Sequence, residues 1–438
     1  MFFISRMPDN PTIEELKELI MNNLDIIKDE KVVFRSEVNT LTKFLSYKHI
    51  ITMTGLRRSG KTYLMYYLIK KLLNEGKKVL YINFDDPIFY LSDYKVFNNI
   101  HSAFLELFNP AKKERVFFFF DEIQNIKGWE RWLSSRYDFN IKFFVSGSNS
   151  RLLGKEYSHK LTGRHKNITV YPLSFMDVVR FHIKNFEKNQ EYVKRIKSRI
   201  KTLLQEYLRY GGLPEVVFEG NKEVLSDYVN DIITKDIIVL NNVKYKEALK
   251  EVVKVLLTNI SSLHTLNSLN KVLNSKNLNT IKNYVSYIEN SFLIFTTKPY
   301  VYSVRKQQKQ PFKVYAYDLG LRNTFSFDFS ENKGKLMENL VAIELKRRNL
   351  EFYYWKSREN YEIDFVVTEK NKVIELINVS YITSKKDIKE REIKGLVKAS
   401  EKFKEAKLVL ITWMVEDKLI FENKEIQLVP LWKFLLKQ

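Results

Sequence analysis

Short apolar runs alternate with helix-like segments through the first part of this sequence. In each run the apolar side chains occupy consecutive positions, so both faces of the expected strands are buried, which is typical of a parallel sheet covered by helices. Segments with a helical period, such as residues 63–76, separate the runs. The pattern predicts an α/β domain over residues 33–175, with strands in the runs HIITMTG, KVLYINF, VFFFFDE and KFFVSG.

The pattern changes on both sides of this domain. Residues 12–28 have the 3.6-residue period of an amphipathic helix, which we assign to a separate N-terminal segment, 1–32. Region 176–328 is mainly helical, and three short helices followed by two β-rich runs predict a winged helix-turn-helix within it. Residues 329–438 return to mixed helices and strands and predict a second, smaller α/β domain.

Composition narrows the class of protein. The 438 residues contain no cysteine and only six scattered histidines, which excludes disulfides and cysteine-bound metals and gives no support for a zinc hydrolase. No apolar run approaches the roughly 20 residues of a membrane span, so we expect a cytoplasmic protein with no membrane partner. The net charge is +21, but 54 lysines against 19 arginines can reflect genome composition or a hot habitat. Charge alone therefore does not establish nucleic-acid binding.

Residues 55–62, GLRRSGKT, fit the pattern G-x-x-x-x-G-K-[S/T] at every required position. They follow an expected strand and precede an expected helix, so backbone N–H groups can converge on phosphate oxygens at a helix N-terminus. Lys61 would reach the β- and γ-phosphates, and Thr62 would bind Mg²⁺. The alternative is a glycine turn with an incidental lysine. We expect ATP to bind along Gly55, Leu56, Arg57, Arg58, Ser59, Gly60, Lys61, Thr62 and Tyr63.

A second motif, VFFFFDE, ends in Asp121 and Glu122. A buried strand that ends in two acids can supply a Mg²⁺ site beside the nucleotide, with Asp121 holding the metal and Glu122 polarising the attacking water. Two exposed acids at a strand end, with no such role, are the alternative. The motif follows GLRRSGKT by about one strand and two helices, and it therefore predicts hydrolysis rather than binding alone.

Further polar residues stand at neighbouring strand ends. Ser148 and Asn149 could touch the γ-phosphate or orient the water, unless they form an ordinary turn. Arg164 follows a glycine and could stabilise transition-state charge, in its own chain or on a neighbouring subunit, or it forms a surface salt bridge. Asp85 and Asp86 follow another strand, and contact with metal or water there is a weaker inference.

Five segments together carry a family resemblance: GLRRSGKT, FFFFDEIQNIKGW, VSGSNSRLL, LTGRHKNITVYPLSF and YLRYGGLPEVV. They resemble the prokaryotic, mainly archaeal, ATPases of the AAA+ type within the P-loop NTPases. Those proteins join the ATPase to a winged helix and to a C-terminal domain related to the PD-(D/E)xK restriction-endonuclease fold. The resemblance covers nearly the whole chain and implies ATP binding. It also implies that Arg164 acts on the transition state and that Gly211, Gly212 and Pro214 form a structural turn.

In an active PD-(D/E)xK domain, carboxylates hold Mg²⁺ and a lysine orients the water or stabilises charge. The resemblance places Glu338, Asp364 and Glu375 at the carboxylate positions, but Ile377 stands where the lysine is expected. Either Asn378 partly substitutes, although it should face the other side of the strand, or the site is degenerate. Three carboxylates could still bind Mg²⁺ or Mn²⁺.

Nucleic-acid binding has two sets of candidate residues. Around the expected winged helix these are Lys276, Lys282, Asn283, Lys298 and Lys306, and beside the nuclease-like strands they are Lys346, Arg347, Arg348, Lys385 and Lys386. The alternative is a solvated lysine-rich surface, with helix 279–291 buried through its apolar residues.

The hypothesis is a Mg²⁺-dependent ATPase whose cycle controls the engagement of double-stranded DNA or a protein partner, with assembly into a homo-oligomer as one option. Two alternatives stay open. One is an ATP-gated, metal-dependent DNA nuclease, and the other is a nucleotide-dependent interaction switch that binds no nucleic acid.

Overall fold

The computed structural model describes residues 9–148, 163–184, 186–187, 193–272, 277–301, 303–325 and 333–437. The chain divides into two compact units, Met1–Val170 and Tyr171–Gln438, and each is described by itself. The domain boundaries expected near residues 32, 175 and 328 stay predictions.

Unit 1 is built on a five-stranded parallel sheet with the order β2-β3-β4-β1-β5. This is the α/β fold that the alternating pattern predicts. Four consecutive phenylalanines in β3 are buried, because the strand is covered on both faces. The strands are β1 (Ile50–Thr54), β2 (Val79–Asn83), β3 (Val116–Asp121), β4 (Ile141–Gly147) and β5 (His165–Thr169).

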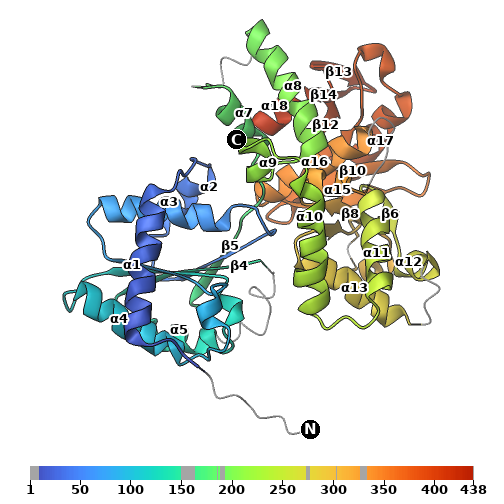
Figure 1. Ribbon diagram of the computed structural model, residues 1–438. Coiled ribbons are helices and arrows are strands. Elements are labelled where there is room, and N and C mark those ends of the chain that lie inside the picture. Colours follow the sequence, from blue (N-terminus) through green and yellow to red (C-terminus); the bar gives the residue numbers. More distant parts are fainter. Residues whose placement is uncertain are drawn as a thin grey trace. The chain divides into compact units, whose positions relative to one another are not determined.

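Helices cover this sheet on both faces. Figure 1 shows α3 on one face and α4 and α5 on the other. Two short 3-10 turns, η1 (Pro87–Phe89) and η2 (Ile123–Asn125), follow β2 and β3. The helices of the unit are α1 (Ile13–Asp29), α2 (Glu37–Lys43), α3 (Lys61–Asn74), α4 (Val96–Phe108) and α5 (Trp129–Arg136).

Helix α1 lies within unit 1 and packs into the core of its sheet. Thr12 caps its first turn, and Glu15 returns a hydrogen bond to Thr12 N at 2.8 Å. Its apolar stripe (Leu16, Ile20, Leu24 and Ile27) joins the same hydrophobic core as the sheet, and the helix packs on α4 and β2. The amphipathic pattern identified the helix correctly, but could not show which surface its apolar stripe contacts.

Unit 2 begins with helices and contains a small antiparallel sheet of order β6-β8-β7. Its first helical elements are α7 (Phe175–His182), α8 (Lys194–Tyr210), α9 (Pro214–Phe218), α10 (Val224–Asp231) and the π-helix η5 (Ile232–Val239). The small sheet and its helices are α11 (Lys246–Thr258), β6 (Leu263–His264), α12 (Leu266–Val272), α13 (Leu278–Asn290), β7 (Ile294–Thr297), α14 (Val304–Lys309) and β8 (Phe312–Ala316).

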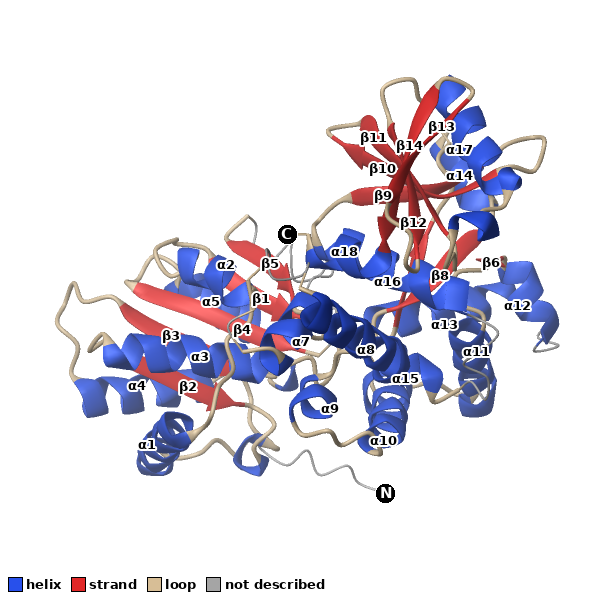
Figure 2. Ribbon diagram, turned by 90° about the horizontal axis from the view of Figure 1, so that it is seen from above, coloured by secondary structure: helices blue, strands red, loops and turns tan. Residues whose placement is uncertain are grey.

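The rest of unit 2 is a six-stranded mixed sheet of order β13-β14-β12-β11-β10-β9, seen at the top of Figure 2. Helix α17 packs on β10, β11 and β12, and α16 and α18 also pack on this sheet. The elements are α15 (Leu319–Asn323), α16 (Lys333–Arg347), β9 (Glu351–Lys356), β10 (Glu362–Glu369), β11 (Lys372–Val379), η6 (Lys385–Asp387), α17 (Glu390–Lys402), β12 (Lys407–Thr412), β13 (Asp417–Phe421), β14 (Lys424–Pro430) and α18 (Leu431–Leu436).

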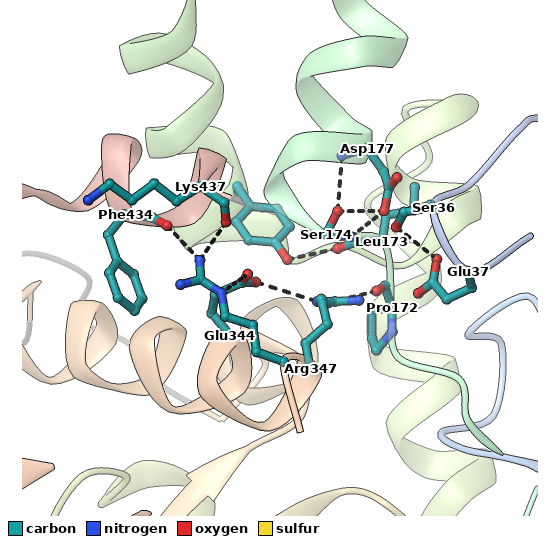
Figure 3. A network of polar contacts seen from close by, with 12 residues as sticks. Ser36, Glu37, Pro172, Leu173, Ser174, Asp177, Glu344, Arg347, Phe434 and Lys437 are labelled. Carbon is teal, nitrogen blue, oxygen red and sulfur yellow. Dashed lines mark hydrogen bonds and ion pairs between the residues drawn. The ribbon is translucent and has the colours of Figure 1, made fainter. Parts of the chain in front are cut away.

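Arg347, the last residue of α16, and Arg348, which follows it, contact the two ends of unit 2; Figure 3 shows Arg347. Arg347 Nη2 donates to Pro172 O at 3.0 Å, and Arg348 Nη2 donates to Phe434 O at 2.7 Å. Glu344, one turn earlier, accepts a 2.9 Å hydrogen bond from Arg348 Nε. These cations, which the sequence offered as phosphate contacts, are therefore occupied in holding backbone carbonyl groups.

The turn at Gly211 and Gly212 is closed by a buried carboxylate. Asp318 caps α15 and accepts a 2.7 Å hydrogen bond from Gly212 N. A Cβ on Gly211, whose φ is +75°, would lie 2.2 Å from Asp318 Oδ1. The two glycines are thus required by the structure of this turn, as expected. In the part of the chain that the structure describes, no helix is both long enough and apolar enough to cross a membrane.

Candidate nucleotide site and carboxylate cluster

The GLRRSGKT segment forms a loop between the end of β1 and the start of α3. Two of its residues take left-handed conformations, Arg58 at φ +65° and Gly60 at φ +91°, and Ser59 N donates to Leu56 O at 3.1 Å. Helix α3 begins at Lys61, so its first-turn N–H groups lie at the loop. This is the arrangement that binds phosphate at a helix N-terminus.

Gly55 is required by a close approach of the backbone. A Cβ at this position would lie 2.1 Å from Val170 O, and Val170 N donates to Thr54 O at 2.7 Å. The loop is therefore packed directly against the end of β5.

Two cations hold the loop from inside. Lys61 is only 5% exposed, and its ammonium donates to Gly55 O and Leu56 O, each at 3.1 Å. Arg35 is also buried and donates through Nη1 to Ser59 O at 2.6 Å, while its Nη2 pairs with Glu37 at 3.2 Å. The lysine that would bind phosphate thus lies within the loop.

Asp121, at the end of β3, joins the loop to the sheet. Thr62 Oγ1 donates to Asp121 Oδ2 at 2.6 Å, and the Tyr81 hydroxyl donates to the same oxygen at 3.2 Å. Ser146 on β4 donates to Oδ1. Burial, and secondly the charge of Glu122, raises the pKa of Asp121 to about 6, although Thr62 and Lys61 oppose the shift.

Glu122 has an unusual backbone conformation for a glutamate, with φ +48°. Its N–H lies 3.2 Å from Asp121 Oδ1 and 3.3 Å from Ser146 Oγ, and its carboxylate accepts a 2.5 Å hydrogen bond from Gln124 Nε2. Such conformations persist where the surroundings impose them, often at functional sites. The side chain is half-buried, and its carboxylate is held by a neutral donor.

Four other residues that were expected near the nucleotide have different outcomes. Asp86 caps η1 by accepting from Ile88 N at 3.0 Å, and Asp85 accepts a 2.6 Å hydrogen bond from Asn125, so both have local structural partners. Ser148 is buried just after β4. Asn149 lies outside the described residues.

Arg164 lies at the opposite edge of the sheet from the loop. Its carbonyl accepts from Ile50 N at the first residue of β1, whereas the loop follows the last, about 16 Å away at 3.3 Å per residue. The guanidinium lies over the Tyr137 ring at 5.1 Å and contacts Ser134 O at 3.5 Å. The structure therefore does not bring Arg164 to the loop of its own chain, and a role in its own chain or on a neighbouring subunit stays a prediction.

In unit 2, Lys313 of β8 forms ion pairs with a cluster of carboxylates. Its ammonium lies 3.1 Å from Glu338 Oε1, 2.8 Å from Glu362 Oε1 and 2.9 Å from Asp364 Oδ1. The Tyr315 hydroxyl also donates to Glu338, at 2.8 Å. Burial raises the pKa of Glu338 to about 8, with the charge of Asp364 the next cause.

The expected trio of Glu338, Asp364 and Glu375 does not assemble. Glu375 pairs with Val367, three residues along β10 from Asp364, or about 10 Å away. Asn378 takes the place beside Asp364 and accepts a 3.1 Å hydrogen bond from Asp364 N. Ile377 is buried, so the missing lysine is not replaced from β11.

A metal ion does not fit this cluster as it stands. Within the described ranges, no group of three or more acidic or histidine side chains is arranged to hold a metal. Lys313 already places a positive charge between the carboxylates, only 2% exposed. The arrangement is a buried ion-pair network.

Sequence reasoning missed several contributors, among them Arg35, Tyr81, Ser146 and Lys313. Ser146 could have been found, because it stands at the end of the strand next to β3, two residues before the chosen Ser148. The other three carry no local signal, since each reaches its partner from a distant segment.

Three family matches divide the chain. Residues 47–179 match a family described as AAA domain. Residues 201–332 and 333–434 match two families, each described as a domain of unknown function (DUF8612 and DUF4143). The AAA match and the five-stranded parallel sheet agree that unit 1 has the fold of a P-loop ATPase of the AAA type.

Two relatives cover most of the chain. An uncharacterized protein of Methanocaldococcus jannaschii is 33% identical over 450 aligned residues, which span 99% of this chain and 97% of that protein. An uncharacterized protein of Haemophilus influenzae is 30% identical over 354 residues, which span 77% of this chain and 85% of that protein.

Solved structures give weaker likenesses. Cdc6p from Pyrobaculum aerophilum has a TM-score of 0.30 at 11% identity, covering 69% of this chain and 97% of that one. The replication initiator DnaA bound to AMPPCP and single-stranded DNA has a TM-score of 0.27 at 14% identity, and the match covers 60% of this chain and 91% of that one. At these scores neither likeness carries an argument.

Proposed function

Because this chain belongs to the same family as the uncharacterized M. jannaschii protein that it matches from end to end, and because it contains an AAA domain, we propose that it is a Mg²⁺-dependent ATPase. ATP would bind along residues 55–63. Turnover would control how the other regions engage DNA or a protein partner.

One observation carries the proposal: Thr62 Oγ1 lies 2.6 Å from Asp121 Oδ2. This contact brings the last residue of the phosphate-binding pattern to the end of the acidic strand. A hydroxyl and a carboxylate are hard oxygen ligands suited to Mg²⁺. The buried Asp121 carboxylate, with its raised pKa, would be stabilised by a divalent cation.

The residues then divide the work. Lys61 would exchange its two carbonyl contacts for phosphate oxygens, and Thr62 and Asp121 would hold Mg²⁺, directly and through water. When bound, Mg²⁺ neutralises charge on the β- and γ-phosphates. Glu122 would orient and polarise the water, with Gln124 fixing its carboxylate. Asn149 stays a proposed contact of the γ-phosphate, and Arg164 a proposed donor to the nucleotide of a second copy.

The test is ATP binding and turnover in three variants. Lys61→Ala should lose ATP binding, whereas Glu122→Gln should bind ATP and lose turnover. Lys71→Ala is the matched control, because Lys71 lies on the same helix, its side chain is 40% exposed and it pairs with Glu75 at 2.9 Å. Normal hydrolysis in both site variants would refute the proposal.

DNA engagement is the finer part of the proposal. The order α11, β6, α12, α13, β7, α14, β8 with a three-stranded antiparallel sheet supports a winged helix. In α13 the apolar face is buried, while Lys282 and Asn283 are exposed, as a groove-reading helix needs. Lys298 is exposed beside β7, and the side chains of Lys276 and Lys306 lie outside the described part.

Duplex binding tests this part. Lys282→Glu should weaken duplex affinity in a salt-dependent way, whereas a chain that binds no duplex at about 50 mM salt would favour the protein-only switch.

We also propose that the C-terminal domain does not cleave DNA, because Lys313 occupies the space between its carboxylates. Incubation of linear, nicked and branched DNA with Mg²⁺ or Mn²⁺ tests this. Cleavage that disappears in Asp364→Ala would restore the nuclease alternative.

A further inference from the structure

A hollow in unit 2 combines aromatic rings with cations. It has a volume of about 640 Å³ and is lined by residues of α8 and α16 and of the strand ends after β11 and β12. Figures 1 and 2 show α8 and α16 side by side. The lining residues that matter here are Tyr210, Tyr381, Trp413, Arg209, Lys222 and Lys333.

The cations are held in place by the rings. Lys222 Nζ lies 4.0 Å from the centre of the Tyr210 ring, and the Arg209 guanidinium lies 5.2 Å from it. Lys333 Nζ lies 4.9 Å from the centre of the Tyr381 ring. Cation–π contacts restrict these long side chains, so their N–H donors are partly preorganised for an anion.

Of these rings, Tyr381 keeps part of its surface accessible to a flat ligand, beside Lys333. Tyr381 is 38% exposed and packs on Trp413, with ring centres 5.6 Å apart. An exposed ring supported from behind by a second ring is a platform on which a nucleobase can stack.

A row of arginines leads to this hollow along α8. Positions 195, 199, 202, 206 and 209 follow each other at intervals of four and three, so they share one face of the helix, and all five are exposed. Three of them are arginine, in a chain with 19 arginines and 54 lysines, and the other two are Thr202 and Glu206. None of the three forms an ion pair with a residue that the structure describes. Arg195 and Arg209 are about 21 Å apart along the axis, enough for several phosphates.

We propose that this face of unit 2 binds single-stranded nucleic acid. The phosphates would follow Arg195, Arg199 and Arg209, and an unstacked base would enter the hollow against Tyr381. A duplex satisfies this geometry poorly, because its bases are stacked on each other and cannot enter. An acidic peptide would use the arginines and leave the rings unused.

The site is distinct from the nucleotide loop and from α13, and the test needs no ATP. Failure of the proposed ATPase would therefore leave this proposal standing, and the reverse also holds.

The experiment measures fluorescence anisotropy of the full chain with a labelled 15-mer of dT, at 50 to 300 mM salt. Two further probes are the matching duplex and a 15-mer backbone without bases. The double variant Arg195→Glu/Arg199→Glu should bind the dT strand at least about tenfold more weakly, with a shallower salt dependence. Tyr381→Leu should remove the preference for dT over the backbone without bases.

A charge-matched control is available on the same unit. Lys404→Glu/Lys424→Glu makes the same change in net charge at two exposed lysines outside the row and the hollow, and it should alter affinity less than about threefold. Equal losses in the two double variants would overturn the proposal. So would a wild-type chain that binds duplex as tightly as the single strand, or that binds the baseless backbone equally well.

Discussion

Lys313 Nζ lies 2.9 Å from Asp364 Oδ1, although the two residues are 51 positions apart and belong to different sheets. The contact ties the small sheet of β6, β7 and β8 to the six-stranded sheet. It also neutralises carboxylates that would repel each other in a buried site.

Replacing Lys313 by methionine should therefore destabilise unit 2. A buried carboxylate pair without its cation costs about 3 to 5 kcal/mol of unfolding free energy. Urea unfolding monitored by circular dichroism measures the change. Lys309→Met is the control, because Lys309 is exposed, and it should change the free energy by less than about 0.5 kcal/mol.

The same variant should gain a response to divalent cations. Without the ammonium, Glu338, Glu362 and Asp364 offer only oxygen ligands, which suit Mn²⁺ or Mg²⁺. Thermal unfolding of Lys313→Met with Mn²⁺ should shift upward by several degrees, while the wild-type unit should not respond. Identical responses of the two proteins would show that Lys313 does not replace a cation.

Nucleotide binding should depend on the ionisation of Asp121. Because burial raises its pKa to about 6, affinity for Mg²⁺ with a non-hydrolysable ATP analogue should rise as the pH passes through about 6. Because the pKa of Asp121 is higher in the folded chain than its ordinary value of 3.8, the protonated carboxyl group stabilises the folded state. This stabilisation is complete below pH 3.8 and is lost as the pH rises through about 6. Glu122→Gln removes the neighbouring charge, so its affinity midpoint should move to lower pH. An unmoved midpoint would contradict the assignment.

Gly211 and Gly220 offer a matched comparison of backbone and contact effects. Both have positive φ, +75° and +74°, but only Gly211 has a neighbour within 4 Å of an added Cβ, the Asp318 carboxylate. Gly220→Ala should cost about 1 kcal/mol of unfolding free energy, the penalty of the left-handed conformation. Gly211→Ala should cost about 3 kcal/mol or more, because Asp318 must also move. Equal losses in urea unfolding would show that the Asp318 contact is unimportant.

Arg164 can be tested by mixing copies. Arg164→Ala keeps the loop intact, and Lys61→Ala keeps the arginine, so each variant alone should hydrolyse ATP poorly. If Arg164 serves a neighbouring copy, mixing the two should restore part of the turnover. Arg131→Ala, an exposed arginine on α5, is the control and should stay fully active. A mixture that associates but gains no activity would count against this role.

The nucleotide loop could be located from the sequence because its requirements are local. Gly55, Gly60, Lys61 and Thr62 lie within eight residues, and their spacing is set by backbone geometry. The pattern of buried strands predicted the sheet for the same reason, because a strand that is buried on both faces has apolar side chains at consecutive positions. The contact between Thr62 and Asp121 could also be predicted, because the carboxyl ends of parallel strands meet at the same edge of a sheet.

The carboxylate cluster could not be predicted in this way. The register of β10 and β11 separates Glu375 from Asp364, and the register against β9 shifts between Ile363 and Val366, close to Asp364. A one- or two-residue change in register is invisible in an apolar pattern, although it decides which side chains meet. Lys313 comes from another sheet, and only tertiary packing brings it to Glu338.

The loop and Arg164 occupy opposite edges of one sheet, and this polarity limits how copies could cooperate. In a pair with two-fold symmetry the same patch of each copy meets, so such a pair can share arginines only if one patch holds both the loop and Arg164; copies that join through two different patches follow each other head to tail. Such a row either closes on itself or leaves one loop at its end without an arginine. Turnover per chain, measured against the mass of the assembly, would therefore distinguish a closed row from an open one. Only the open row contains a nucleotide loop that no arginine serves.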